Sequence, residues 1–227
     1  MEKIDFKIGD ILIDTQYDDY FGISCGHSML VVYVDNNNDR ILISHSGFDF
    51  PETIRWIGYN SFIDKNLSIN QPKKYLIRWI GPEKAIDIET RKYTCIREKI
   101  FETVNDIYKL SKTNTEINYS WSKGIYIALT RNGFMENRKI KKELKNILEE
   151  YSFICSSYIT FIWKYVLETF LLAENITIDD DAFPINPFEF LPKDIFLLPN
   201  KYPQYWALIP YIVEKINNIE MQEIKSI

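Results

Sequence analysis

The sequence predicts one α+β domain, with a β-sheet in the first third of the chain and helices after it. Short apolar runs bounded by turn residues occupy the first 80 residues, and from Ile96 onwards apolar residues recur at helical spacing. The hydrophobic fraction of 46% and the charged fraction of 26% are ordinary for a globular protein. No repeat and no linker rich in glycine or serine divides the chain. We therefore expect a single domain over residues 1–227, with a β-rich part at 8–82, a helical part at 94–173 and a proline-rich segment at 184–213.

Four apolar runs predict the first strands, at residues 11–13, 28–34, 40–45 and 74–79. The first run follows a Gly9-Asp10 turn, and we expect Asp10 to organise that turn. The sequence DNNND at 35–39 is typical of a turn, so the second and third runs are expected to form a hairpin. A last strand is expected at 205–213.

Helical spacing is clearest at Ile96, Ile100, Val104 and Ile107. Further helices are expected at 122–129 and at 136–150. The apolar stretch from Phe153 to Ala173 is long enough to span a membrane, but Lys164 and Glu168 interrupt it. A charge near the middle of a span costs about 2.5–3.5 kcal/mol. We therefore predict a buried core helix that begins at Cys155, and no transmembrane segment.

Composition excludes some classes of function. The net charge of −5 gives no reason to expect nucleic-acid binding. The three cysteines, Cys25, Cys95 and Cys155, have neither disulfide-framework nor zinc spacing, which favours a reducing compartment or free thiols. We expect no metal and no cofactor. The charged N-terminus lacks the apolar region of a signal peptide. A cytoplasmic protein is expected, although export by a specialised secretion system would leave no mark in the sequence.

Three residues suggest thiol chemistry when they are taken together. The chain contains two histidines, His27 and His45, on either side of the expected hairpin, and Cys155 at a helix start. A helix N-terminus and a nearby imidazole both favour the thiolate, which is the nucleophilic form of cysteine. Catalysis also needs a base within hydrogen-bond reach and a group that orients that base. Cys25 is a weaker candidate nucleophile because a strand edge offers no helix dipole.

The identity of the orienting group depends on the register of the hairpin. His27, Met29 and Val31 share one face of their strand because side chains alternate along it. If the numbers of paired residues sum to an even value, His45 lies on the His27 face, and if the sum is odd, Ser44 does. We prefer His45, because an imidazole orients another imidazole better than a hydroxyl does.

Several short motifs resemble those of the circularly permuted NlpC-type cysteine hydrolases, the YiiX-like branch of the papain-like fold. The lecithin retinol acyltransferase family is a related branch. In these families the histidine precedes the cysteine, as His27 precedes Cys155 here. The motifs span most of residues 8–200, and their order carries the resemblance: Gly9-Asp10-Ile11-Leu12, Gly26-His27-Ser28, Asn118-Tyr119-Ser120-Trp121, Phe153-Ile154-Cys155-Ser156-Ser157, Asn186-Pro187 and Leu191-Pro192.

The resemblance implies a permuted papain-like fold, with an antiparallel sheet packed on a helical part and the nucleophile at a helix N-terminus. It implies that Cys155 is the nucleophile and His27 the general base. Many YiiX-like members have Glu where this chain has Ser44-His45, whereas the acyltransferase branch uses a second histidine there. Tyr119, together with the backbone N–H of Cys155 or Ser156, is implied to stabilise the oxyanion.

The expected function is that of a thiol-dependent hydrolase or acyltransferase acting on an amide, ester or thioester bond. The candidate substrates are a peptide, a peptidoglycan peptide, an acyl lipid and an acylated protein. A bacterial toxin or translocated effector would fit this activity, and a toxin would have a cognate inhibitor protein. The alternative is a non-catalytic binding module on the same fold, because the usual Glu is absent and Ser120 stands where the family has Asp.

Overall fold

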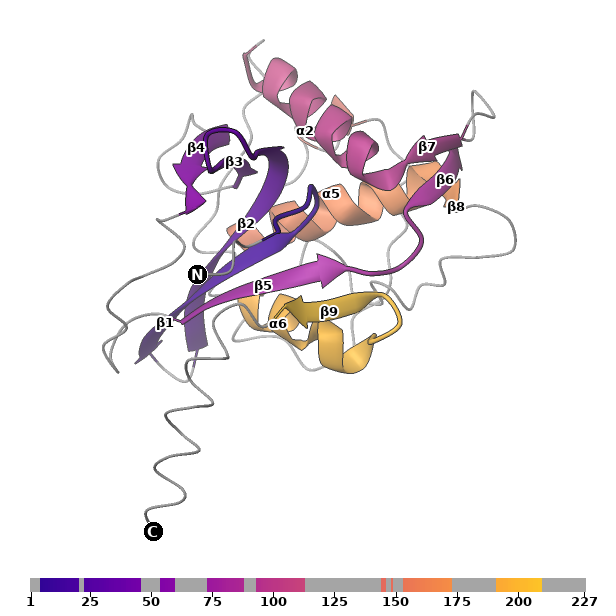
Figure 1. The fold of residues 1–227 in the computed structure, drawn as a ribbon. Coiled ribbons are helices and arrows are strands. Elements are labelled where there is room, and N and C mark those ends of the chain that lie inside the picture. The colour runs from indigo at the N-terminus through magenta and orange to yellow at the C-terminus, as the bar shows by residue number, and fades with distance from the viewer. Residues whose placement is uncertain are drawn as a thin grey trace.

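The computed structural model describes about half of the chain, in stretches that include both histidines and Cys155. The N-terminal strands, the long helices and the C-terminal strand lie close together (Figure 1). The described residues are 5–20, 23–45, 54–59, 73–87, 93–112, 144–145, 148, 153–172 and 191–209.

The main sheet has six antiparallel strands in the order β4-β3-β2-β1-β5-β9. Its two longest strands, β1 and β2, lie side by side in the middle, and the C-terminal strand β9 pairs with β5 at one edge. The strands are β1 Ile11–Tyr20, β2 Ile23–Asp35, β3 Arg40–Ser44, β4 Ile54–Gly58, β5 Lys73–Trp79 and β9 Trp206–Ile209.

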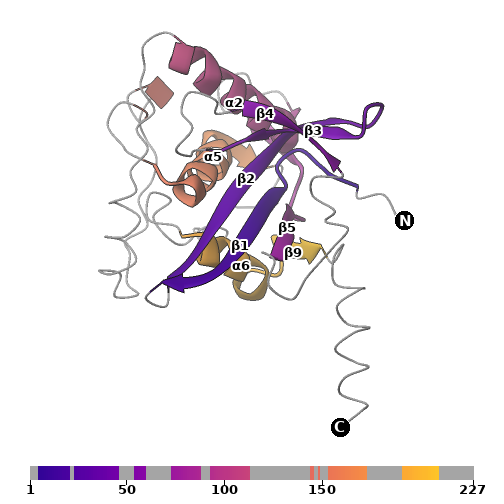
Figure 2. The same cartoon turned by 90° about the vertical axis from the view of Figure 1, so that its left-hand side faces the viewer.

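Among the described elements, helices α2, α5 and α6 pack beside this sheet, and Figure 2 shows α2 and α5 together on one side of β1 and β2. A second sheet of three short antiparallel strands, in the order β7-β6-β8, lies where the chain enters α2 and leaves α5. The helices are α2 Ile96–Lys112, α5 Cys155–Thr169 and α6 Pro192–Lys201, and the short strands are β6 Lys84–Asp87, β7 Tyr93–Cys95 and β8 Phe170–Leu172.

Alternation along the strands gives the main sheet two buried faces. Leu30 and Val32 of β2 point into the large core that also contains the apolar sides of the three helices. Met29 and Val31 point the other way, into a smaller cluster with Phe6. In β2, Ser28, Leu30 and Val32 therefore face α5, and His27, Met29 and Val31 face away from it.

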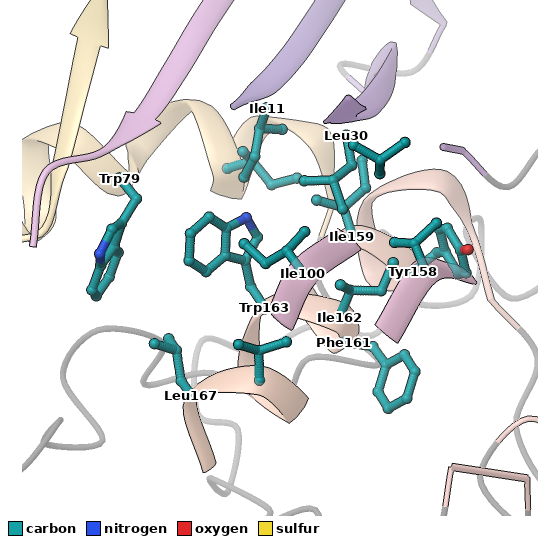
Figure 3. Packing of buried hydrophobic residues seen from close by; sticks show 14 of the residues in the cluster. Ile11, Leu30, Trp79, Ile100, Tyr158, Ile159, Phe161, Ile162, Trp163 and Leu167 are labelled. Atoms are coloured by element: carbon teal, nitrogen blue, oxygen red, sulfur yellow. The ribbon is translucent and has the colours of Figure 1, made fainter. Parts of the chain in front are cut away.

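Tryptophans join α5 to the sheet at the centre of the large core (Figure 3). Trp79 of β5 and Trp206 of β9 occupy paired positions, with ring centroids 5.2 Å apart. Trp163 of α5 packs against both, at 5.4 and 5.1 Å. All three side chains are almost fully buried, so they contribute a large share of the apolar area removed from water.

The turn before β1 is tied to the same core. Gly9 has a φ of +90°, and its carbonyl accepts a hydrogen bond of 3.2 Å from the indole N–H of Trp163. Asp10 is fully buried and accepts the Lys7 N–H at 2.8 Å and two guanidinium hydrogen bonds from Arg78, at 2.9 and 2.7 Å. Asp10 therefore organises this turn, as its position in the sequence predicted, and also joins the turn to β5.

The α+β class is confirmed, and each predicted strand is present with different ends. Strand β1 runs seven residues further than expected, to Tyr20, and the last strand begins at Trp206 and is described as far as Ile209. The predicted helix at 122–129 lies outside the described residues, as does most of the one at 136–150, where Leu144, Lys145 and Leu148 are helical.

The predicted division of the chain needs correction in several places. Strands β6 and β7 extend the β-rich part beyond residue 82, and the helix from Cys155 ends at Thr169 because the chain then pairs with β6 as β8. Residues 192–201 of the proline-rich segment are helical. Pro192 lies in the first turn of α6, where its missing N–H breaks no helical hydrogen bond. No helix of the described residues is long and apolar enough to cross a membrane.

We predict that Gly9→Ala destabilises the fold by about 2–4 kcal/mol. The positive φ is strained for alanine, and the added Cβ would lie 2.7 Å from Trp163 and 2.9 Å from Ile100. Urea unfolding at pH 7 measures the loss. The matched control is Asp39→Gly, which places glycine at an exposed position of positive φ and should change stability by less than about 1 kcal/mol. Equal stability of Gly9→Ala and the natural protein would contradict the packing described here.

Candidate thiol site and the histidine pair

Cys155 is the first residue of α5, and the start of this helix is well defined. The Ile154 carbonyl accepts the first helical hydrogen bond, from the Tyr158 N–H, at 2.9 Å. The Ser157 hydroxyl accepts the Ile154 N–H at 2.9 Å and caps the helix from within its first turn. No acidic side chain lies in that turn. The N–H groups of Cys155 and Ser156 are consequently not used by the helix itself.

Donors from two elements converge on the buried thiol of Cys155. Burial raises the pKa of this thiol, and the Ser28 hydroxyl, the Ser28 N–H and the N–H groups of Ser156 and Cys155 oppose the increase. Such donors stabilise a thiolate more than a neutral thiol. Because burial has the larger effect, the resting site holds a protonated thiol at neutral pH. The implied role of the Ser156 N–H is compatible with this geometry.

The two histidines meet, and a β-bulge brings them together. Next to the turn, β2 and β3 pair with an odd sum, as in Val34 opposite Ile41. The register shifts between Tyr33 and Val31, and beyond it Val31 pairs with Ile43, an even sum. His45 therefore follows Ile43 onto the His27 face. The rings of His27 and His45 lie edge to face, with centroids 5.1 Å apart.

Ser44, the other candidate for the orienting role, lies on the opposite face and has a different partner. Its hydroxyl lies 3.1 Å from the phenol oxygen of Tyr158, and both residues are fully buried. Burial raises the pKa of Tyr158 to about 12, and the bond to Ser44 reduces the increase. This hydrogen bond attaches β3 to α5 one turn after Cys155.

The histidine pair and the thiol lie on different faces of β2. Ser28 shares its face with Leu30 and contacts Cys155, whereas His27 shares its face with Met29. The structure thus brings His27 to His45, and Ser28 to Cys155. The adjacent positions of His27 and Ser28 in the sequence place the two groups on either side of one strand.

The surroundings of His27 keep its imidazole neutral. Burial, with a smaller effect from the charge of Arg55, lowers the pKa of His27 to about 4. Strand β1 places Asp14 opposite His27 in the backbone register. The imidazole is therefore a proton acceptor at neutral pH, although a weak one.

The remaining candidate residues of the sequence are Tyr119 and the other two cysteines. Tyr119 lies outside the described residues, as does its neighbour Ser120. Cys95 ends β7 with a free, partly buried thiol, and Cys25 lies in β2. In the part of the chain that the structure describes, no three or more His, Cys, Asp or Glu side chains are grouped to hold a metal ion.

Sequence reasoning missed Ser28 as a contact of the thiol. The only signal was its position after His27, on the face of β2 that packs against a helix. A strand alone does not reveal which of its two faces the helix covers.

Comparison with known proteins adds no identification. No protein-family model, no curated protein and no solved structure matches this chain significantly. The resemblance to the permuted NlpC-type hydrolases therefore rests on the short motifs, and the roles of Cys155, His27 and His45 stay predictions.

We predict that His27 makes the protein less stable in acid. Its pKa is about 4 when folded and 6.5 when unfolded, so the unfolded chain binds the proton more tightly. The free energy of unfolding is then highest above pH 6.5 and falls as the pH is lowered towards 4, by at most about 3 kcal/mol from this group. Urea unfolding of the natural protein and of His27→Gln between pH 7 and 4.5 measures the difference.

The His27→Gln protein should lose less stability over this range than the natural protein does. Between pH 7.5 and 8.5 the imidazole is neutral in both states, so the two proteins should show the same pH dependence there. Identical curves from pH 7 to 4.5 would mean that the imidazole of His27 is not buried in its neutral form.

Proposed function

We propose that the protein is a thiol-dependent hydrolase or acyltransferase in which Cys155 is the nucleophile. The observation that supports this best is the position of Cys155, which begins α5 next to the buried Ser28 of β2: burial raises the pKa of its thiol, and the hydroxyl and N–H of Ser28 and the N–H groups of Ser156 and Cys155 lower it. These donors and the N-terminus of α5 favour negative charge at one point. An inert core cysteine needs no such set. The helix-covered antiparallel sheet also suits the permuted papain-like fold that the motifs suggest.

The reaction can be written from these groups. The Cys155 sulfur forms a bond to the carbonyl carbon of an amide, ester or thioester, and the thiol proton passes through a base to the leaving amine, alcohol or thiol. Water or a second acceptor then takes the acyl group and restores the thiol. The N–H group of Cys155 or Ser156 stabilises the oxyanion, together with Tyr119. One such donor is typically worth about 3–4 kcal/mol.

In this proposal His27 is the base and His45 orients it. Side chains of successive residues alternate across β2, so His27 reaches the thiol only if the backbone at Gly26-His27 turns relative to Ser28. Edge-to-face contact with His45 would fix the orientation of the imidazole before and after proton transfer. The base is therefore tested separately from the nucleophile.

A non-catalytic binding module is the second candidate function, and the burial of Cys155 favours it. The residue is 6% exposed, and burial raises the pKa of its thiol. A buried thiol of this kind reacts slowly. If the protein is such a module, the sulfur only serves as an acceptor for N–H groups at the helix N-terminus, and these groups have no role in turnover.

We predict that Cys155→Ala lowers acyl transfer or hydrolysis at least about 1,000-fold, because the nucleophile is lost. The substrates are p-nitrophenyl esters of short and long acids, an acylated peptide, and a peptidoglycan stem peptide, each assayed for turnover. Intact-mass spectra should show an acyl adduct on the natural protein. Cys95→Ser is the matched control, and it should keep both the adduct and the turnover.

The variant His27→Gln tests the base in the same assays. Loss of turnover with retention of slow adduct formation is expected, since the nucleophile remains. If Cys155→Ala retains full activity on a substrate that the natural protein uses, the proposed nucleophile is wrong. If no substrate reacts and the thiol resists iodoacetamide up to pH 9, the binding module is supported.

A further inference from the structure

Within the described part of the chain, Ser28 has a buried hydroxyl without the hydrogen-bond partner that buried hydroxyls usually have. The residue is fully buried, and its Oγ forms no hydrogen bond of normal geometry among the described residues. A buried hydroxyl without a partner destabilises the folded protein. By contrast, the buried hydroxyl of Ser44 on β3 lies 3.1 Å from the phenol oxygen of Tyr158.

The neighbour of this hydroxyl is the sulfur of Cys155. Strand β2 brings the Ser28 hydroxyl and its N–H to the thiol from one side, and α5 brings the N–H groups of Cys155 and Ser156. A neutral thiol is a weak hydrogen-bond acceptor, whereas a thiolate is a strong one. The donor set is therefore complete only when the site carries a negative charge.

We infer that Ser28 is a positioning residue whose hydroxyl donates to the charged form of the Cys155 site, the thiolate and then the oxyanion of the acyl intermediate. This inference deepens the proposed function and rests on it for its catalytic consequence. The donation to the thiolate can be tested on the thiol alone, without a substrate. The hydroxyl adds a donor without adding a charge, so it stabilises the anion while the site stays buried.

The titratable side chains described near the N-terminus of α5 do not take the place of the Ser28 hydroxyl as a donor to the thiol. Tyr158 bonds to Ser44, and the Asp194 carboxylate on α6 accepts the Leu191 N–H at 2.8 Å. His27 lies on the other face of β2. Burial and the donors of Ser28, Ser156 and Cys155 have the largest effects on the pKa of the thiol.

The test is the pH dependence of Cys155 alkylation by iodoacetamide, with each labelled cysteine peptide quantified by mass spectrometry. Cys25 and Cys95 then report separately from Cys155. Ser28→Ala should move the midpoint of the Cys155 curve upwards by about one pH unit, which corresponds to about tenfold slower alkylation below the midpoint. A change in packing or access alone would change the rate at every pH and leave the midpoint in place.

Two further variants complete the experiment. Ser28→Thr keeps a hydroxyl and should restore the midpoint. Ser44→Ala removes a buried hydroxyl on the same side of the sheet that contacts Tyr158 and is not among the groups with the largest effects on the pKa of the thiol, so it should leave the midpoint of Cys155 unchanged. If Ser28→Ala fails to fold, Ser28→Thr carries the test, because a midpoint within about 0.3 units of the natural value supports the inference and a rise of a full unit opposes it.

The outcomes for the two proposals are distinct. An upward shift in Ser28→Ala without turnover on any acyl substrate would support the role of Ser28 and refute the proposed catalysis. Turnover that depends on Cys155, with the same alkylation midpoint in Ser28→Ala, would support the catalysis and overturn the role of Ser28.

Discussion

The packing of Trp163 determines where α5 lies on the sheet, and the candidate site depends on it. Its indole contacts Trp79 and Trp206 at one edge of the sheet and donates a hydrogen bond to the Gly9 carbonyl. Cys155 is eight residues earlier in the same helix, about 12 Å along its axis. A helix held rigidly at Trp163 can keep its first turn against β2, where Ser28 lies. Glycine at position 9 permits this approach because it has no Cβ to displace the indole.

The first turn of α5 concentrates polar atoms within an apolar core. Ser157 satisfies the backbone before the helix, Tyr158 bonds to Ser44 on β3, and Cys155 meets the donors of Ser28. Polar groups buried in this way are costly unless they are paired, so each one limits how the helix can sit on the sheet. In the Ser28–Cys155 contact, the Ser28 hydroxyl forms no hydrogen bond of normal geometry with any described residue, and a negative charge on the sulfur would strengthen the contact.

The Cys155 thiol and the His27 imidazole lie on opposite faces of the main sheet, and strand β2 contributes to both environments. On the α5 face the thiol stays protonated because it is buried, and on the other face the imidazole of His27 stays neutral for the same reason. A proton can move between a neutral thiol and a neutral imidazole only when both become better solvated or approach each other. The chemistry proposed for Cys155 therefore depends on the conformation of β2 at Gly26-His27. Glycine at position 26 permits dihedral angles that other residues rarely adopt.

Local patterns in the sequence determined the α+β class, the first strands and the helix that begins at Cys155. Apolar periodicity and turn residues suffice for this because they depend only on residues close together in the sequence. They also determined that His45 and Ser44 would point to opposite faces. Tertiary structure decided which of the two meets His27, through a bulge beside Val32 that changes the register of the hairpin. It also decided that Ser28 meets the thiol, since that depends on which face of the sheet α5 covers. Helix α6 was missed because prolines suggest irregular chain, although Pro192 lies where a helix tolerates it. The alternation of side chains between two faces is a property of a single strand. The register of the hairpin depends on the partner strand, and the face that is covered depends on where the helix packs.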